Sequence, residues 1–273
     1  MRQFLFTDVE NPVRTAGLGF VLRFMLYEKR CIMRLNYDFH LHSCLSPCGD
    51  MDMTPYNIAN MAKILELDII ALTDHNTAGN CRAAIKAGEK AGVVVVPGME
   101  MCTAEEIHVV CLFPDIEHAE SFEKKVKAAM PPIRNKPDIF GRQVYMDEAD
   151  NETGEEEILL ITASGITISE VPKLCREHGG FCYPAHINRS SFSILATLGM
   201  VTADMGFDCV EVTRDADLAQ ILKTNPDVAD MRIMKSSDAH YLESMDMASE
   251  TINLPEISAA ALINYLRGGK QDG

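Results

Sequence analysis

The chain has 273 residues, of which 47% are hydrophobic, so it can bury an ordinary core as one large domain or two small ones. Forty acidic against 25 basic side chains give a formal net charge of -15, and the resulting field repels polyanions. This balance excludes a protein that coats nucleic acid without sequence preference. A phosphorylated ligand would need bound cations or a local basic patch.

The N-terminal residues 1–33 precede the first convincing strand and are expected to form an extension of uncertain role. Their apolar stretch 17–27 contains Arg23, is shorter than the roughly 20 residues of a spanning helix, and has no signal-peptide cleavage pattern. The nine cysteines include no Cys-x-x-Cys pair, which favours reduced thiols over disulfides or a zinc ribbon. We therefore expect a cytoplasmic protein without membrane association.

Short apolar runs alternate with amphipathic stretches from residue 35 onward. The pattern predicts seven strands, at 37–40, 69–73, 93–97, 108–113, 181–184, 209–212 and 233–236. It predicts helices at 54–67, 78–91, 116–130, 169–178 and 217–224, the first with Thr54 as cap and Pro55 at the first helical position. This alternation is typical of βα units, so we expect an α/β fold with a largely parallel sheet in one catalytic domain, residues 34–273.

Residues from about 131 to 157 interrupt the alternation. They contain Pro131, Pro132 and Pro137, followed by an acidic run at 147–157. We interpret the segment as an insertion in the domain whose charged residues are mostly solvated.

Histidines and carboxylates gather at the ends of the predicted strands. They are Asp38, His40, His42, Asp74, His75, Glu100, His186, Asp238 and His240, with His108 on a further strand. The carboxyl ends of the strands in a parallel barrel converge on one face. Imidazole and carboxylate ligands together suit zinc, manganese or iron, and bridging carboxylates let two or three ions share a site. The remaining histidines, His118 and His178, fall in predicted helices and are expected at the surface.

Other catalytic patterns have less support. Neither a Gly-x-Ser-x-Gly elbow nor a nucleotide-binding P-loop is present. A catalytic cysteine at Cys44 or Cys48, beside the histidine pair, stays open as an alternative. Asp74 is expected either to orient an imidazole or to cap the following helix.

Five segments in order resemble the PHP family, the polymerase and histidinol phosphatase group of metal-dependent phosphoesterases. They are DFHLHS (38–43), LTDHN (72–76), PGME (97–100) with His108 downstream, PAH (184–186) and SDAH (237–240). The resemblance implies a distorted seven-stranded (β/α)7 barrel with two or three divalent ions, zinc, manganese or iron, at the C-terminal ends of the strands. The implied ligands are His40, His42, Asp50, His75, Glu100, His108, His186, Asp238 and His240.

The ligand in the first loop has three candidates. Many family members read Ser-Asp-Gly-x-Leu-Thr-Pro there, whereas this chain reads SPCGDMDMTP at 46–55, three residues longer. Counting back from the shared Thr-Pro favours Asp50. Counting forward from His40 falls near Cys48, so Cys48 and Asp52 are the alternatives.

A weaker resemblance, carried by DIFGRQ (138–143) and PAHINRSSFS (184–193), is to the endonuclease Q-like branch of the family. We expect hydrolysis of a small phosphomonoester, a nucleotide or a short oligonucleotide end by a metal-activated hydroxide, with long duplex nucleic acid disfavoured by the acidic surface.

Arg189 is the best-placed arginine to bind a phosphate, ahead of Arg142 and Arg214. A structure-selective nuclease, with Arg134, Lys136 and Arg142 as a basic rim, and a non-catalytic regulatory module are the alternative functions.

Overall fold

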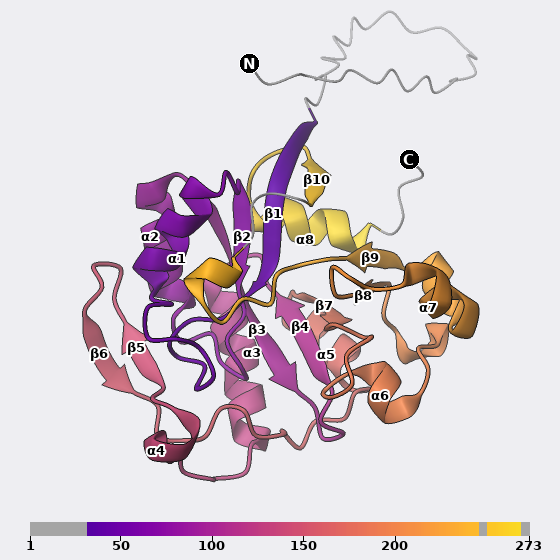
Figure 1. The fold of residues 1–273 in the computed structure, drawn as a ribbon, viewed down its shortest axis with the longest axis horizontal. Helices are drawn as coiled ribbons and strands as arrows, with labels where there is room; N and C mark the ends of the chain where they lie inside the picture. Colours follow the sequence, from indigo (N-terminus) through magenta and orange to yellow (C-terminus); the bar gives the residue numbers. More distant parts are fainter. Residues whose placement is uncertain (1–31, 246–249, 269–273) are drawn as a thin grey trace, which may run out of the picture.

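The main sheet of the protein has six strands and curls around the centre of the molecule. The computed structural model describes residues 32–245 and 250–268, and Figure 1 shows their arrangement. The strand order is β10-β1-β2-β3-β4-β7. The bounds are β1 Met33–Leu41, β2 Ile69–Leu72, β3 Val94–Cys102, β4 His108–Leu112, β7 Phe181–Pro184 and β10 Thr251–Leu254.

Strand directions in this sheet are mixed. β1, β2 and β3 are parallel, whereas β4 is antiparallel to both β3 and β7, and β10 is antiparallel to β1. The prediction of a largely parallel sheet is therefore confirmed only for β1, β2 and β3 of this sheet. Because β4 is reversed, its first residue, His108, lies at the same edge as the last residues of β1, β2 and β7.

The other two predicted strands form a separate parallel pair, β8 Cys209–Glu211 with β9 Arg232–Met234. β8 lies beside β7, where the backbone N–H of Ile187 donates to the carbonyl of Glu211 at 2.8 Å. After β9 the chain returns to β1 through an isolated parallel bridge between Ala239 and Leu41. All seven predicted strands are present, but their expected closure as one seven-stranded barrel is not confirmed, because the ladder is a six-stranded sheet that includes β10.

Helices cover the outside of the sheet. They are α1 Pro55–Ile64, α2 Cys81–Ala91, α3 Ile116–Ala129, α5 Val171–Glu177, α6 Ile194–Leu198 and α7 Leu218–Thr224. Thr54 caps α1 as predicted, because its Oγ1 accepts from the N–H of Asn57 at 3.2 Å. α2 ends where Gly92 adopts a left-handed φ of 78°. The five predicted helices are confirmed, with shorter bounds.

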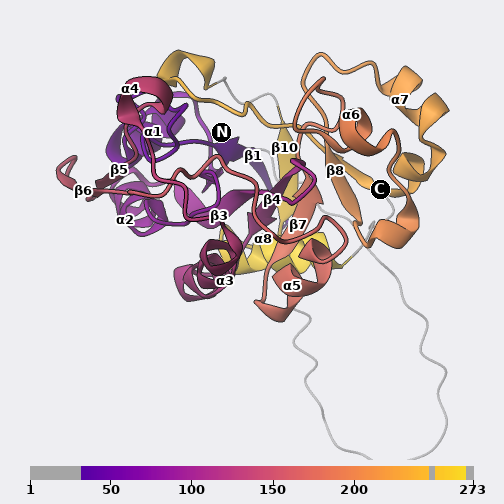
Figure 2. The same cartoon turned by 90° about the horizontal axis from the view of Figure 1, so that it is seen from below.

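Helix α8, Ala259–Arg267, was not predicted. It contacts β3, β7 and β10, and Figure 2 shows it beneath the sheet. β10 pairs with the beginning of β1, and Arg267 donates to the carbonyl of Gly180, just before β7. The helix therefore covers the N-terminal ends of the parallel strands and leaves their C-terminal ends open.

Both faces of the sheet are buried, as expected for a sheet covered by helices. Ile70 and Leu72 of β2 pack in one apolar cluster with α1, α2 and α3, whereas Ile69 and Ala71 pack in a second cluster with α8. This alternation follows from the two-residue period of a strand. In the part of the chain that the structure describes, no helix is both long and apolar enough to cross a membrane.

The segment predicted to be an insertion forms structure of its own. It contains the short helix α4 Pro137–Phe140 and a hairpin of β5 Val144–Met146 with β6 Glu152–Glu155. The hairpin is tied to the domain where the N–H of Val144 donates to the carbonyl of Cys44. Residues 152–155 are exposed, in line with a solvated acidic run. The predicted N-terminal extension, residues 1–33, lies outside the described residues except for its last two positions.

Candidate metal centre

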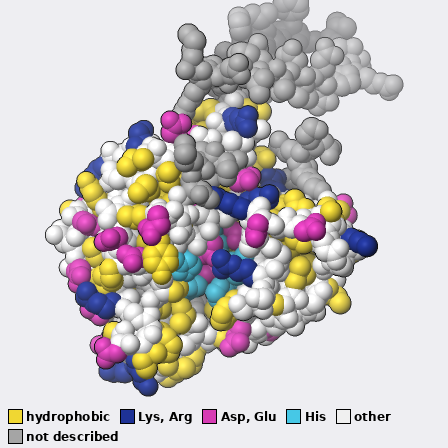
Figure 3. Space-filling view, in the orientation of Figure 1, with side chains coloured by type: hydrophobic (Ala, Val, Ile, Leu, Met, Phe, Trp, Pro, Cys, Tyr) yellow, Lys and Arg dark blue, Asp and Glu magenta, His cyan; other side chains and the backbone are white. Residues whose placement is uncertain are grey.

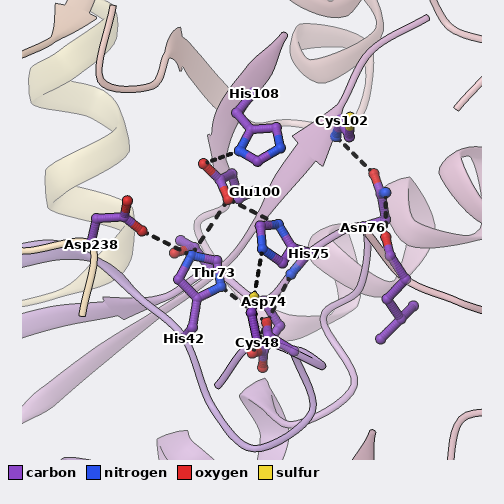
Figure 4. A network of polar contacts seen from close by, with 12 residues as sticks. His42, Cys48, Thr73, Asp74, His75, Asn76, Glu100, Cys102, His108 and Asp238 are labelled. Carbon is purple, nitrogen blue, oxygen red and sulfur yellow. Dashed lines mark hydrogen bonds and ion pairs between the residues drawn. The ribbon is translucent and has the colours of Figure 1, made fainter. Parts of the chain in front are cut away.

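Glu100 lies at the centre of a buried cluster of histidines. Its Oε1 is 2.9 Å from His108 Nδ1, 3.1 Å from His186 Nε2 and 3.2 Å from His40 Nε2. Its Oε2 is 2.9 Å from His75 Nδ1 and 3.4 Å from His42 Nε2. Figure 4 shows part of this arrangement, with His42, His75 and His108 around the carboxylate.

Asp238 and His240, from the segment after β9, complete the cluster. Asp238 Oδ1 is 3.3 Å from His40 Nε2 and 3.2 Å from His42 Nε2. The ring of His240 is stacked on that of His42, with centroids 4.2 Å apart. Eight of the nine residues proposed as ligands are therefore brought together from six strands or strand ends. In the space-filling view, histidine side chains lie on the floor of a hollow with basic side chains beside it (Figure 3).

The donor atoms of the cluster fit divalent metal ions. Four buried atoms of the cluster make no hydrogen bond, although each lies within 3.5 Å of another possible ligand atom. They are His40 Nε2, His42 Nε2, His75 Nδ1 and Asp238 Oδ1. Unpaired buried polar atoms are costly unless another partner satisfies them. Three groups have ligand atoms close enough to share an ion, namely His40/His42/Asp238, His75/Glu100/His108 and His42/His75/His240.

The two histidines of the first strand have opposite electrostatic environments. Burial by itself lowers the pKa of His40, but the carboxylates of Glu211, Asp238 and Glu100 outweigh burial and hold that pKa well above its ordinary value. Burial, together with the adjacent rings of His240 and His75, lowers the pKa of His42 well below its ordinary value. The carboxylates thus retain positive charge at His40, which is charge that a bound cation would replace.

Glu211 is a site residue that sequence reasoning missed. Its carboxylate, at the end of β8, accepts from His40 Nδ1 at 3.0 and 3.2 Å and from the backbone N–H of His186 at 3.1 Å. A hydrogen bond of this kind fixes the imidazole ring so that its other nitrogen can face a metal ion. The available signal was a single acidic residue inside the apolar strand 209–212.

Asp74 anchors the loop after β1. Its carboxylate accepts from the N–H and hydroxyl of Ser43 at 2.7 and 2.6 Å and from Ser46 Oγ at 2.7 Å. Ser46 Oγ also lies 3.0 Å from His42 Nδ1, so Asp74 acts on that imidazole through a serine. The alternative role as helix cap is wrong, because the residue before α2 is Asn80.

Backbone strain is concentrated at the cluster. His186 and Asp238 have φ values of 28° and 52°, in the left-handed region that costs energy for residues other than glycine. Such a conformation persists where the chain must turn sharply after a strand so that a side chain points into the site. His186 lies two positions after the end of β7, and Asp238 lies four positions after the end of β9.

The proposed ligand Asp50 is placed differently from the other eight. Its Oδ1 accepts from the N–H of Asp52 at 2.8 Å. Among the described residues, neither Asp50 nor Cys48 belongs to the three groups above. The sulfur of Cys48 instead lies 3.2 Å from His75 Nε2, as Figure 4 shows. Desolvation opposes ionisation of Cys48, but His75 and His240 outweigh it and lower the pKa of the thiol to about 6.

Cys44 does not fit the role of nucleophile. It is fully buried, and burial together with the Asp74 carboxylate raises the pKa of its thiol to about 12. A thiol that is neutral at ordinary pH and closed to solvent is inert.

Arg189 contacts the cluster directly. Its Nη1 lies 2.6 Å from Asp238 Oδ2, and its side chain is 46% exposed. Arg189 and Arg214 line a cavity of about 130 Å³ with His186 and Asp238. Arg142, by contrast, is paired with Glu152 and Glu155 of the hairpin.

A curled α/β sheet with histidines and carboxylates at its open end defines a class of metal-dependent hydrolases. The sequence profile of the PHP domain matches residues 38–177, just over half of the chain. The chain therefore belongs to the PHP domain family, as the motifs indicated.

Several individual proteins match only part of this chain or cover only part of their own length. The 5'-3' exoribonuclease Rnm of Salmonella typhimurium is 33% identical over 87 residues, which are 30% of this chain and 29% of that protein. The lesion-specific endonuclease Q of Pyrococcus furiosus is 18% identical, with a TM-score of 0.59 over 86% of this chain and 56% of its own. Another endonuclease Q structure, with a 27-mer duplex substrate, has a TM-score of 0.62.

A protein described as a putative metal-dependent phosphoesterase, from Bifidobacterium adolescentis, is 19% identical and has a TM-score of 0.55. It is matched over 96% of its length and 86% of this chain. The chain thus spans less than a third of Rnm and little more than half of endonuclease Q, but nearly all of the phosphoesterase. These structural similarities establish the shared fold.

Proposed function

We propose that this chain is a metal-dependent phosphoesterase that hydrolyses a small phosphomonoester, a nucleotide or a short oligonucleotide end. The observation that carries the proposal is the convergence of six histidines, Glu100 and Asp238 on one buried cluster with Arg189 at its edge. The cluster provides enough imidazole and carboxylate donors for two or three ions, with zinc, manganese and iron as the candidates.

Divalent ions bound there would supply positive charge for the phosphoryl oxygens and would lower the pKa of a water toward neutrality. The residues of the chain position this chemistry. Glu211 orients His40, and the Asp74–Ser46 pair orients His42, so that the free nitrogens of both rings face the cluster. Arg189 is the residue proposed to bind the phosphoryl group, because its guanidinium reaches the cluster and has planar donors for phosphate.

The cavity beside Arg189 supports a small reacting group. Its volume of about 130 Å³ is well below the 300–1,000 Å³ typical of pockets that enclose a whole ligand. It has room for a phosphoryl group, with the rest of the substrate outside. Beyond about 8–10 Å from bound ions the field of a protein with net charge -15 again repels a polyanion.

Hydrolysis of a phosphate-ester library, by protein loaded separately with manganese, zinc and iron, tests the proposal. We expect turnover of small esters or mononucleotides that a chelator abolishes and the metal restores. Turnover that no metal supports, or that a Glu100→Gln protein retains in full, would contradict it.

A nuclease is the second candidate, favoured by the matches to Rnm and endonuclease Q. The basic rim that it was expected to use is weakened, because Arg134 pairs with Glu157 and Arg142 pairs with Glu152 and Glu155. Rates for a mononucleotide, a short 5'-phosphorylated RNA and a long duplex DNA, measured side by side, separate the candidates. Faster cleavage of the duplex would favour the nuclease.

A further inference from the structure

The loop from Ser43 to Asp50 holds its residues in defined positions at the open end of the sheet. Ser43 and Ser46 are bound to the buried carboxylate of Asp74, and the N–H of Gly49 donates to the carbonyl of Ser46. A side chain at Gly49 would meet the carbonyl oxygen of Ser43 at 2.3 Å, so the turn requires glycine. Cys48 therefore lies on a constrained turn.

The sulfur of Cys48 faces two histidines of the cluster. It is 3.2 Å from His75 Nε2 and lies near the side chain of His240. His75 directs its other ring nitrogen, Nδ1, to Glu100 at 2.9 Å, so its two nitrogens face two different places in the cluster. The Nε2 face, with Cys48 and His240, lies toward solvent, because Cys48 is exposed and His240 is 23% exposed.

A second observation points to an ion at this place. His42 is fully buried and its Nε2 has no hydrogen-bond partner, and its ligand atom lies within 4.8 Å of those of His75 and His240. Two donors that share a tetrahedral zinc ion at ordinary Zn–S and Zn–N lengths are about 3.6 Å apart. The distance of 3.2 Å between Cys48 Sγ and His75 Nε2 is close to that value.

The neighbouring carboxylates are not suited to the same role. Asp50 has its Oδ1 occupied by the N–H of Asp52, and its own N–H donates to the carbonyl of His240. Asp52 is exposed, and its N–H and carbonyl are bound to Asp50 and Asn57. Both therefore serve the turn that presents Cys48.

We propose that Cys48, and not Asp50 or Asp52, is the first-loop ligand, and that with His75 and His240 it forms a thiolate-containing metal site at the outer edge of the cluster. A thiolate selects borderline or soft ions, so this site takes zinc or ferrous iron in preference to manganese or magnesium. The assignment uses the same metal centre as the proposed function, but it does not depend on which reaction the centre catalyses.

Cobalt(II) reconstitution tests the assignment directly, because a sulfur ligand produces a near-ultraviolet charge-transfer band that oxygen and nitrogen ligands do not. Wild-type protein and the Cys48→Ser, Asp50→Asn and Asp52→Asn variants are loaded with Co²⁺ and with Zn²⁺, and the metal per chain is measured. We expect Cys48→Ser to lose the band and one ion per chain, and both aspartate variants to keep them. A band that survives in Cys48→Ser, or an ion lost in Asp50→Asn, overturns the assignment.

Alkylation of the wild-type protein gives a readout that needs no variant to fold. Cys48 is the exposed thiol among the cysteines that the structure describes, and the others are buried. With peptide mapping after iodoacetamide treatment, we expect Zn²⁺ to slow modification of Cys48 by about tenfold or more, because a metal-bound thiolate is not free to react. Equal rates with and without Zn²⁺ overturn the assignment. A cobalt–sulfur band without any phosphoesterase turnover would contradict the proposed function alone, and turnover without the band would contradict this assignment alone.

Discussion

Replacing Glu211 with glutamine is expected to weaken metal binding without removing any proposed ligand. The residue is 2% exposed, and its carboxylate accepts two contacts from His40 Nδ1 and one from the N–H of His186. Glutamine preserves the shape and one acceptor oxygen but removes the charge that holds the His40 ring in place. Ligand-orienting carboxylates of this kind typically change metal affinity by about 10–100-fold.

That range corresponds to roughly 1.4–2.8 kcal/mol of binding free energy. It agrees with the about 1.5–3 kcal/mol of a hydrogen bond to a charged group, the main interaction that the substitution removes. Competition with a chelator of known zinc affinity measures the change, and the zinc-induced rise in Tm provides an independent check. Glu243→Gln, at an exposed position in the 3-10 helix Leu242–Ser244, is the matched control.

The Glu211→Gln variant is expected to bind zinc more weakly than the Glu243→Gln control. An affinity of Glu211→Gln for zinc within about twofold of wild type would refute the orienting role, since that is well under the range expected for such partners. Loss of the folded state would leave the Tm comparison uninformative, so the circular dichroism of the metal-free variant is measured first. We expect it to match wild type, because the substitution conserves volume.

Three further predictions concern separate parts of the molecule. His240→Ala should abolish activity and change the Tm of the metal-free protein by little, because the side chain is 23% exposed; a fully active variant would contradict its role as ligand. Arg189→Ala should lower kcat/KM about tenfold at unchanged metal content, the lower end for a charged contact because the side chain is 46% exposed, and unchanged kinetics would remove it from the site. Burial opposes ionisation of Glu156, but Lys127 and Tyr145 outweigh it and lower the pKa of this carboxyl below 4.5. Its stabilising effect is therefore present above that pH and is lost as the pH falls through the lower folded-state pKa. Glu156→Gln should thus cost about 1 kcal/mol at pH 7 and almost nothing in acid, as urea unfolding at both pH values would measure, and an equal cost at both would contradict the charge.

The positions of the helices and strands around the cluster were predictable because they depend on local patterns. Apolar runs marked β1, β2, β3 and β7, and the Thr54-Pro55 pair marked the start of α1. The direction of β4 was missed, although only five residues separate it from β3 and a parallel return needs a crossover of a dozen or more. β10 and α8 were missed because their short patterns gain stability mainly from packing against the rest of the sheet.

Some residues of the candidate site could be predicted from the sequence and others could not. The histidine and acid motifs, with His40, His42 and Glu100 among their residues, could be recognised because they lie at or just after predicted strands in the sequence. Glu211 could not, since an acid in a short apolar run has meaning only when His40, 171 positions away, is known to lie beside it. For the first loop the sequence favoured Asp50, with Cys48 and Asp52 as alternatives, because counting along a loop of unusual length does not say which side chain points inward.

By itself, the sequence determined the family, the order of the seven predicted strands and five predicted helices, and eight of the imidazoles and carboxylates that one end of the fold brings together. These depend on residue type and on separations of a few positions, where strand and helix periods act. Only the tertiary structure decided which strands pair, that β4 is reversed so that His108 reaches the cluster, and that Glu211 supports His40. It also decided that the thiol of Cys48 faces His75 while Asp50 binds its own loop. Such contacts depend on the packing of segments far apart in the chain, and no local pattern encodes them.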